Sequence, residues 1–178
     1  MSDFGELTGP NTIRFERLLP GPIERVWSYI VDGDKRAKWL CGGDTELQVG
    51  GSVELRFHNA TISDLPDDPP PEKYAGMNDE VTYGGTITRC DAPTLLAHTW
   101  EIDDEKSEVC YELFPAGNEV RLVITHSRLD TPGMLASACG GWHTHLAILA
   151  DVLEGRDRRP FWKTHSVLEA EYDKRLPS

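Results

Sequence analysis

Two histidines are the residues whose type and position could do chemistry in this chain. His126 ends an alternating stretch and shares the parity of its apolar residues, so its side chain is expected on the inner face of a strand. His145 follows Trp142 by three residues in a long helical pattern. If the strand and the helix pack together, the two imidazoles could meet in a cavity and hold a ligand carbonyl or carboxylate, or act as acid and base near neutral pH. The alternative is that each is a buried histidine hydrogen-bonded to a neighbour.

Other chemistry has little support in the sequence. His143 and His145 are two residues apart, which on a helix points them about 200° apart, so they cannot share a metal ion. Cys139 lies close to His143, but a lone cysteine on a helix is usually a small buried hydrophobe. The chain has no Gly-x-Ser-x-Gly elbow and no phosphate-binding loop of the Gly-x-x-x-x-Gly-Lys type. We therefore expect no metal, no cofactor and no covalent nucleophile.

The element expected to position His145 is a single helix of about six turns. Its apolar residues recur at spacings of three and four and form one stripe: Leu135, Ala138, Trp142, Leu146, Leu149 and Leu153. Thr131 and Pro132 are suited to begin this helix, and Gly155 to end it. From about Val53 to His126 the preceding residues alternate as strands. A long helix after antiparallel strands suggests a helix lying across a curved sheet, with a pocket between them.

The rest of the chain completes this arrangement. A strand is expected over 12–19, and Pro22 begins a helix that is followed by a short helical turn from Asp32 to Trp39. A short last helix is expected from Pro160 to Leu176. Further strands are expected at 53–57, 81–87, 94–101, 109–113 and 120–126. The inward parity of 94–101 is ambiguous.

The segment Asn59–Asp79 differs from the rest of the chain. Its prolines and acidic residues resist both helix and sheet. A loop of this length in a compact domain is often a functional lid or is disordered. As a lid it would lie over the entrance of the pocket.

The composition predicts one globular domain, assigned to residues 12–176, in a chain of 178 residues. Thirty acidic and eighteen basic residues give a net charge of −12, which disfavours nucleic acids and anionic membrane surfaces as partners. The four cysteines form no Cys-x-x-Cys pair, and the N-terminus has no signal-peptide pattern. No apolar run reaches the roughly 20 residues of a membrane-spanning helix. We therefore expect a cytoplasmic protein with reduced thiols.

The order of several short motifs resembles that of a known superfamily. The motifs are Pro22-x-x-x-Val26-Trp27, Trp39, Val49-Gly50-Gly51, Gly84-Gly85-Thr86-Ile87 with Asp91-Ala92-Pro93, Leu96-x-x-Thr99-Trp100, Thr125-His126-Ser127 and Gly141-Trp142-x-x-His145-Leu146. From about Thr12 to Leu176 the chain resembles the SRPBCC (START/birch-pollen-allergen-like) superfamily. Within it, the chain is similar to bacterial single-domain homologues of the activator of heat shock protein 90 ATPase.

This resemblance implies an α+β helix-grip fold, in which a curved antiparallel sheet wraps around the long C-terminal helix and two short helices follow the first strand. It also implies an internal cavity, which in many relatives holds an apolar ligand. It implies no single activity, because the superfamily includes lipid carriers, hormone receptors, aromatase/cyclases and co-chaperone domains.

The leading hypothesis is a binder of a small hydrophobic molecule, with weak enzymatic activity or none. The residues expected to line its cavity are Phe57, Tyr83, Tyr111, His126, Trp142 and His145. The second hypothesis is a protein-binding module with a chaperone as partner, although eukaryotic activators carry a further N-terminal domain for which this chain has no room. The third is an enzyme of the cyclase, dehydratase or hydrolase kind that uses His126 or His145. A homodimer is left undecided.

Overall fold

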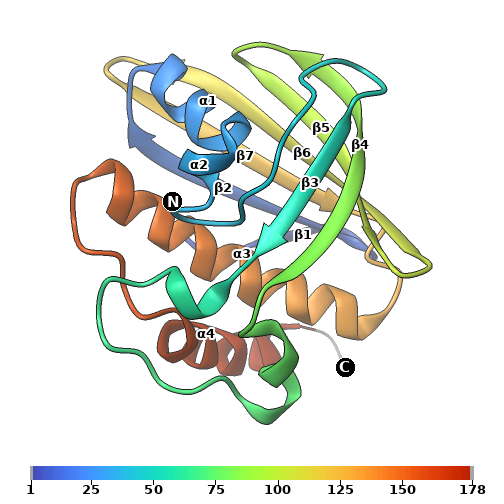
Figure 1. The fold of residues 1–178 in the computed structure, drawn as a ribbon, viewed down its shortest axis with the longest axis vertical. Helices are drawn as coiled ribbons and strands as arrows, with labels where there is room; N and C mark the ends of the chain where they lie inside the picture. The colour runs from blue at the N-terminus through green and yellow to red at the C-terminus, as the bar shows by residue number, and fades with distance from the viewer. Residues whose placement is uncertain (1, 177–178) are drawn as a thin grey trace.

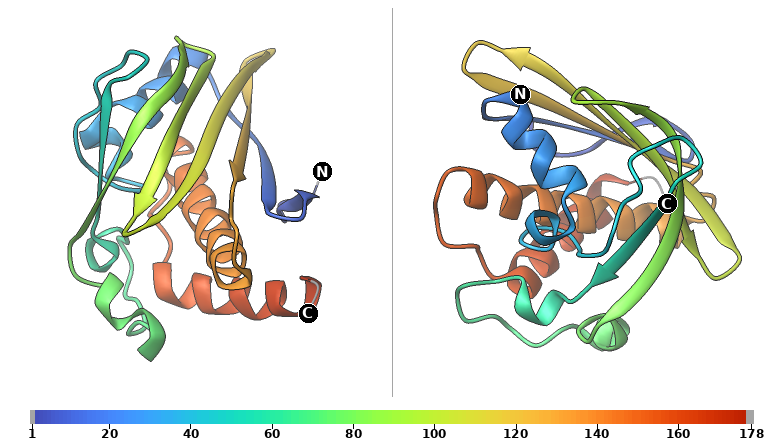
Figure 2. Two further views of the ribbon diagram at one scale, coloured as in Figure 1. Left: turned by 90° about the vertical axis from the view of Figure 1, so that its right-hand side faces the viewer. Right: turned by 45° about the horizontal axis from the view of Figure 1, so that its top comes forward.

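In a computed structural model that describes residues 2–176, a curved sheet of seven antiparallel strands wraps around a long helix (Figures 1 and 2). The strands are β1 Glu6–Gly9, β2 Thr12–Pro20, β3 Ser52–Phe57, β4 Val81–Asp91, β5 Leu95–Ile102, β6 Glu105–Ala116 and β7 Glu119–Ser127. The helices are α1 Ile23–Val31, α2 Gly33–Arg36, α3 Pro132–Leu153 and α4 Phe161–Arg175, with short 3-10 helices η1 Asn59–Thr61 and η2 Glu72–Met77. The sheet order is β1-β2-β7-β6-β5-β4-β3. The α+β helix-grip prediction is confirmed.

Alternation of side chains gives the sheet an apolar face towards α3. Every second residue in the middle of β6 and β7 is buried there: Val109, Tyr111, Leu113, Val120, Leu122 and Ile124. In β5, whose inward parity the sequence leaves ambiguous, His98 packs against Tyr111 on this inner face. Trp100, two residues further on, packs against Trp142 of α3. The side chains of β5 that face α3 therefore include that of Trp100.

Helix α3 is buried on more sides than its apolar stripe predicts. Its start follows the predicted cap, because Thr131 Oγ1 accepts the Met134 N–H at 3.1 Å. Thr144 and Asp151 are buried although they lie outside the stripe. The reason is α4, which packs along α3 on the side opposite the sheet (Figure 1). Helix α4, Phe161–Arg175, lies within the expected bounds Pro160–Leu176. No helix in the described range is long and apolar enough to cross a membrane.

Strand β1 is not predicted by the sequence. Residues Glu6–Gly9 have no alternating apolar pattern, and three of the four are exposed. The strand forms by pairing with β2, where Glu6 lies opposite Arg14 and Leu7 lies opposite Ile13. The sheet therefore begins ahead of residue 12.

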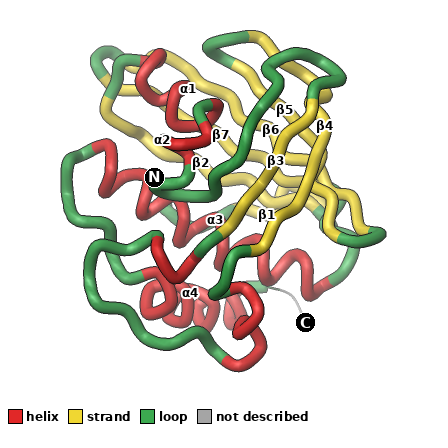
Figure 3. The backbone as a smooth tube through the Cα atoms, viewed as in Figure 1, coloured by secondary structure: helices red, strands yellow, loops and turns green. Residues whose placement is uncertain are grey.

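The segment Asn59–Asp79 is the long connection between β3 and β4 (Figure 3). The Asp67 carboxylate accepts the N–H of Trp162 at 2.8 Å and that of the next residue at 3.0 Å. Ser63 Oγ accepts the N–H of Phe161 at 2.9 Å. Because the residue before α4 offers no side-chain cap, the connection satisfies the free N–H groups that begin this helix. The segment is thus fixed to α4.

Arg36 organises the turn between α2 and β3 from inside the protein. It is only 3% exposed. Its guanidinium donates hydrogen bonds of 2.8–3.3 Å to Thr45 Oγ1 and to the carbonyls of Ile30, Cys41, Gly42, Gly43 and Glu54. A planar guanidinium with five N–H donors can satisfy several buried carbonyls at once.

We predict that Arg36→Met lowers the free energy of unfolding by about 3 kcal/mol or more, because several buried carbonyls lose their donors at once. Urea denaturation measures this change. The matched control is Arg56→Met on β3, whose side chain is 46% exposed and pairs with Glu54 on the surface, and it should change stability by less than about 1 kcal/mol. Equal stability of the two variants would contradict the structural role of Arg36.

Candidate ligand-binding pocket

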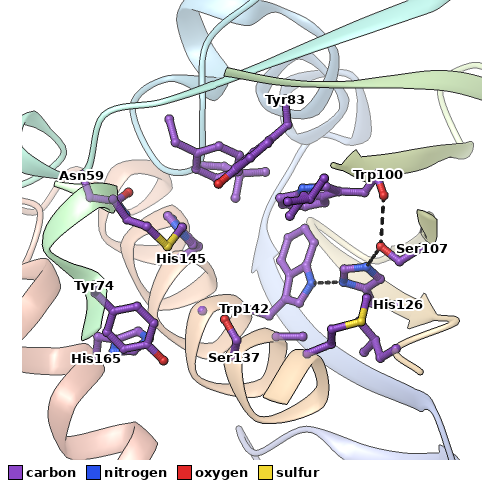
Figure 4. Close-up of a pocket in the computed structure, with 18 of the residues that line it drawn as sticks. Asn59, Tyr74, Tyr83, Trp100, Ser107, His126, Ser137, Trp142, His145 and His165 are labelled. Atoms are coloured by element: carbon purple, nitrogen blue, oxygen red, sulfur yellow. Dashed lines mark hydrogen bonds between the residues drawn. The ribbon is translucent and has the colours of Figure 1, made fainter. Parts of the chain in front are cut away.

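A pocket of about 340 Å³ lies between α3, the sheet, the Asn59–Asp79 connection and the start of α4 (Figure 4). Each of the strands β3 to β7 contributes at least one wall residue. Most of the wall is apolar or aromatic: Leu40, Phe57, Tyr74, Met77, Tyr83, Trp100, Ile102, Leu129, Met134, Ala138, Trp142, Phe161 and Trp162. The remaining side chains are polar: Asn59, Glu105, Ser107, His126, Ser137, His145 and His165.

Five of the six residues that the sequence selected lie on this wall: Phe57, Tyr83, His126, Trp142 and His145. The sixth, Tyr111, does not. Its ring is 1% exposed and packs edge-on against Trp142, with centroids 6.0 Å apart. The expectation that Tyr111 lines the cavity is corrected. Strand parity determines which face of the sheet a side chain is on, but not whether the pocket extends to its position along the strand. The pocket lies near the beginning of β6, at Ser107, whereas Tyr111 lies in the packed middle of the strand.

His126 is held by hydrogen bonds at both ring nitrogens. Trp142 Nε1–H donates to His126 Nδ1 at 2.9 Å, and His126 Nε2 lies 2.8 Å from Ser107 Oγ. An indole nitrogen can only donate, so Nδ1 must be the acceptor and Nε2 must carry the proton. Ser107 Oγ in turn lies 3.4 Å from the Trp100 carbonyl. The chain of contacts ties α3 to β7, β6 and β5.

This arrangement leaves His126 unsuited to acid–base chemistry. Protonation of Nδ1 would place two N–H groups against each other, and the ring is 6% exposed. Burial lowers the pKa of His126 to about 3. Of the two alternatives for this residue, the buried hydrogen-bonded histidine describes its environment.

His145 has one nitrogen engaged and one unpartnered. Its Nδ1 lies 2.7 Å from the Trp39 carbonyl, which can only accept, so Nδ1 carries the proton. Burial lowers the pKa of His145 to about 4. In this neutral tautomer Nε2 is an acceptor, and it has no hydrogen bond within residues 2–176. His126 and His145 do not face each other: in Figure 4 they lie on either side of Trp142.

Several wall residues were missed by the sequence reasoning. His165, Phe161 and Trp162 come from α4, and Asn59 and Tyr74 come from the β3–β4 connection. Phe161 and His165 are four residues apart, which places them on one face of a helix, and that spacing was the available signal. Nothing in the sequence showed that α4 would pack beside α3. Within residues 2–176 no group of three or more His, Cys, Asp or Glu side chains is placed to hold a metal ion.

We predict that the protein loses stability steeply below pH 6.5. Burial lowers the pKa to about 3 for His126 and to about 4 for His98, His143 and His145. Unfolded imidazoles titrate near pH 6.5, so the unfolded chain takes up protons that the folded chain does not. The stabilisation is complete above that pH and is lost as the pH falls towards 4, by roughly 4–7 kcal/mol for the four groups between pH 7 and 5.

Urea denaturation at pH 7.5, 6 and 5 measures this loss. His126→Asn should make the pH dependence less steep, since an amide can both accept from Trp142 and donate to Ser107 without titrating. His58→Gln is the control, because His58 is exposed and should leave the profile unchanged. A free energy of unfolding that stays constant from pH 7 to pH 5 is the contrary result.

Comparisons with known proteins place this fold in a family. The model of the family described as Activator of Hsp90 ATPase homolog 1-like protein matches residues 20–154. The solution NMR structure of the protein encoded by gene BPP1335 from Bordetella parapertussis is 43% identical, with a TM-score of 0.80 over 99% of this chain and 94% of that chain. No curated protein sequence matches the chain.

Two more distant structures share the fold. The crystal structure of CalU16 from Micromonospora echinospora is 21% identical, with a TM-score of 0.69 over 94% of this chain and 89% of that chain. The crystal structure of CV1439 from Chromobacterium violaceum is 24% identical, with a TM-score of 0.63 over 82% of this chain and 99% of that chain. With a family model matched over most of its length and a relative of 43% identity, the chain belongs to the Activator of Hsp90 ATPase homolog 1-like family of the SRPBCC superfamily.

Proposed function

We propose that this protein binds a small, largely apolar molecule in the pocket between α3 and the sheet. The observation that carries the proposal is an aromatic-lined space inside an otherwise packed domain. Its volume of about 340 Å³ lies at the small end of the ~300–1,000 Å³ typical of ligand pockets. Four rings from four elements line it: Phe57, Tyr83, Trp100 and Trp142.

These rings are held in position by contacts with one another and with His126. Trp100 stacks on Phe57 with ring centroids 5.4 Å apart and on His126 with centroids 5.6 Å apart. Trp142 meets Trp100 edge-on at 5.8 Å and is fixed by its hydrogen bond to His126. A pocket whose walls are already ordered loses little conformational entropy when a ligand enters.

The same contacts favour binding over catalysis by a histidine pair. Both nitrogens of His126 are engaged, and His145 lies on the other side of Trp142. General acid–base catalysis needs a group within hydrogen-bond reach of the substrate proton. Of the two histidines, this leaves the unpartnered Nε2 of His145 as the group for orienting a ligand.

A chaperone-binding role is the second candidate, and the description of the matching family supports it. It makes a separate prediction, namely that the purified protein stimulates the ATPase of an Hsp90-type chaperone. Substitutions inside the pocket would leave such stimulation unchanged, because a protein partner contacts the outer surface. The two functions can therefore be tested independently.

Native mass spectrometry of the purified protein, followed by denaturing extraction and small-molecule analysis, tests the proposed function directly. An apolar compound that co-purifies supports it and reveals the chemical class of the ligand. Retention of that compound can then be compared between the native protein and variants with a filled pocket.

We predict that Gly141→Leu abolishes ligand binding without loss of stability. Gly141 is on the pocket wall, and a Cβ atom added there would meet no heavy atom within 4 Å. A leucine side chain therefore occupies the space of the ligand. Because glycine inside a helix is about 1 kcal/mol less favourable than a good helix former, the variant should be as stable as the native protein or slightly more stable.

Gly84→Leu is the matched control. Gly84 is exposed on β4, has equally open space around its Cβ position and does not line the pocket, so ligand binding should be retained. Binding by the folded Gly141→Leu variant at the native level would show that the ligand site lies elsewhere.

A further inference from the structure

The pocket wall contains no cationic side chain. Among its 22 residues there is no lysine and no arginine, and Glu105 is the only carboxylate. Burial lowers the pKa of the wall histidines, to about 3 for His126 and about 4 for His145, and also lowers that of His165. The imidazoles are therefore neutral at physiological pH. No charged group on this wall compensates the desolvation of an anionic ligand, which in a largely apolar pocket is expensive.

The polar groups of the pocket gather at one end. His145 and His165 pack on the same ring, that of Phe161, with centroid distances of 4.9 and 5.8 Å. Figure 4 shows both imidazoles, together with Asn59, on the side of the pocket away from His126. The opposite side is formed by the indoles of Trp100 and Trp142.

The hydrogen-bonding capacity of this end is unused. Asn59 Oδ1 and His165 Nδ1 are buried and have no hydrogen-bond partner, and both residues are 4% exposed. His145 Nε2, which is less deeply buried than these two atoms, makes no hydrogen bond within residues 2–176. Buried polar atoms are nearly always hydrogen-bonded, so Asn59 Oδ1 and His165 Nδ1 indicate a missing partner at this end. On the opposite side, the buried Nε1–H of Trp100 is also without a partner and leaves one neutral donor there.

The chemistry of that partner follows from the tautomers. His145 Nδ1–H is committed to the Trp39 carbonyl, so Nε2 can only accept and needs a donor. His165 makes no hydrogen bond within the described chain, so its proton can reside on either nitrogen and the ring can donate. A hydroxyl group offers both kinds of bond, because it donates one hydrogen bond and accepts another.

We propose that the ligand is an uncharged aromatic molecule whose hydroxyl group binds between His145 and His165, while its rings lie against Trp100 and Trp142. This inference rests on the proposed ligand-binding function and specifies its substrate class. Carboxylates are excluded by the same wall, since they bring a charge, and in ionised form have no proton to donate to His145. The nearest charged groups to His165, Glu169 and Lys73, pair with each other at 2.9 Å and do not line the pocket.

Three probes of one ring system test the inference: naphthalene, 2-naphthol and 2-naphthoate, titrated at pH 7.5 and followed by NMR chemical-shift changes. We expect 2-naphthol to bind at least about tenfold more tightly than naphthalene, because its hydroxyl group forms hydrogen bonds with a polar site that naphthalene leaves unpaired. We expect 2-naphthoate to bind more weakly than 2-naphthol by a similar factor. Equal affinities for naphthalene and 2-naphthol, or tightest binding of 2-naphthoate, would overturn the inference and leave the proposed function standing. Binding of none of the three would overturn both.

His165→Phe separates recognition from folding. The imidazole makes no hydrogen bond in the folded protein, so a phenyl ring of similar shape should not lower stability. We expect the variant to bind naphthalene as the native protein does, and its preference for 2-naphthol to fall below about threefold. His58→Phe, at an exposed position, is the control and should keep the full preference. A preference for 2-naphthol that survives in His165→Phe would exclude His165 as the recognition residue.

Discussion

The hydrogen bond from Trp142 to His126 fixes helix α3 relative to the sheet, and the pocket depends on it. The indole of Trp142 is the largest side chain on the inner face of α3, and its nitrogen can only donate. By offering Nδ1 at 2.9 Å, His126 sets both the height of the helix above β7 and the rotation of the indole. Trp100 and Tyr111 then pack edge-on against that ring. The space beyond it, towards α4, is left unfilled and forms the pocket.

The α4 side of the pocket is held in place by ion pairs and by helix-capping hydrogen bonds. Asp151 of α3 is 3% exposed and accepts hydrogen bonds from Arg156 and Arg159, which fixes the turn into α4. A buried carboxylate needs such partners, because its desolvation is otherwise uncompensated. The β3–β4 connection then caps α4 through Ser63 and Asp67. The pocket is therefore closed by elements that are distant in sequence and that meet through these polar contacts and through ring contacts such as that of Tyr74 with Trp162.

The sequence predicted where the helices and strands lie better than it predicted which of them pack together. Strand parity and helical spacing follow from local side-chain direction, so the inner faces of β3, β6, β7 and α3 were predictable. The sequence put Tyr111 on the correct face of the sheet. It also put Tyr111 on the pocket wall, where the structure does not have it, because alternation does not show how far along a strand the pocket extends. Strand β1 was missed because its exposed residues lack a pattern. His145 and His165 both pack on Phe161, and His145 does not face His126. This arrangement depends on how α4 packs, and no local rule predicts that.

The histidines show that residue types able to act as acids or bases do not by themselves predict catalysis. Three of them lie on or against α3 and each links that helix to a different neighbour: His126 to the sheet, His143 to Tyr172 of α4, and His145 to the carbonyl of Trp39. A neutral imidazole suits this role because it offers one donor and one acceptor on a flat, mostly apolar ring. Burial keeps it neutral, and the same burial removes the charge that would attract an anion. The histidine nitrogens that these links leave unused lie at the α4 end, so selectivity there comes from the tautomer and not from charge.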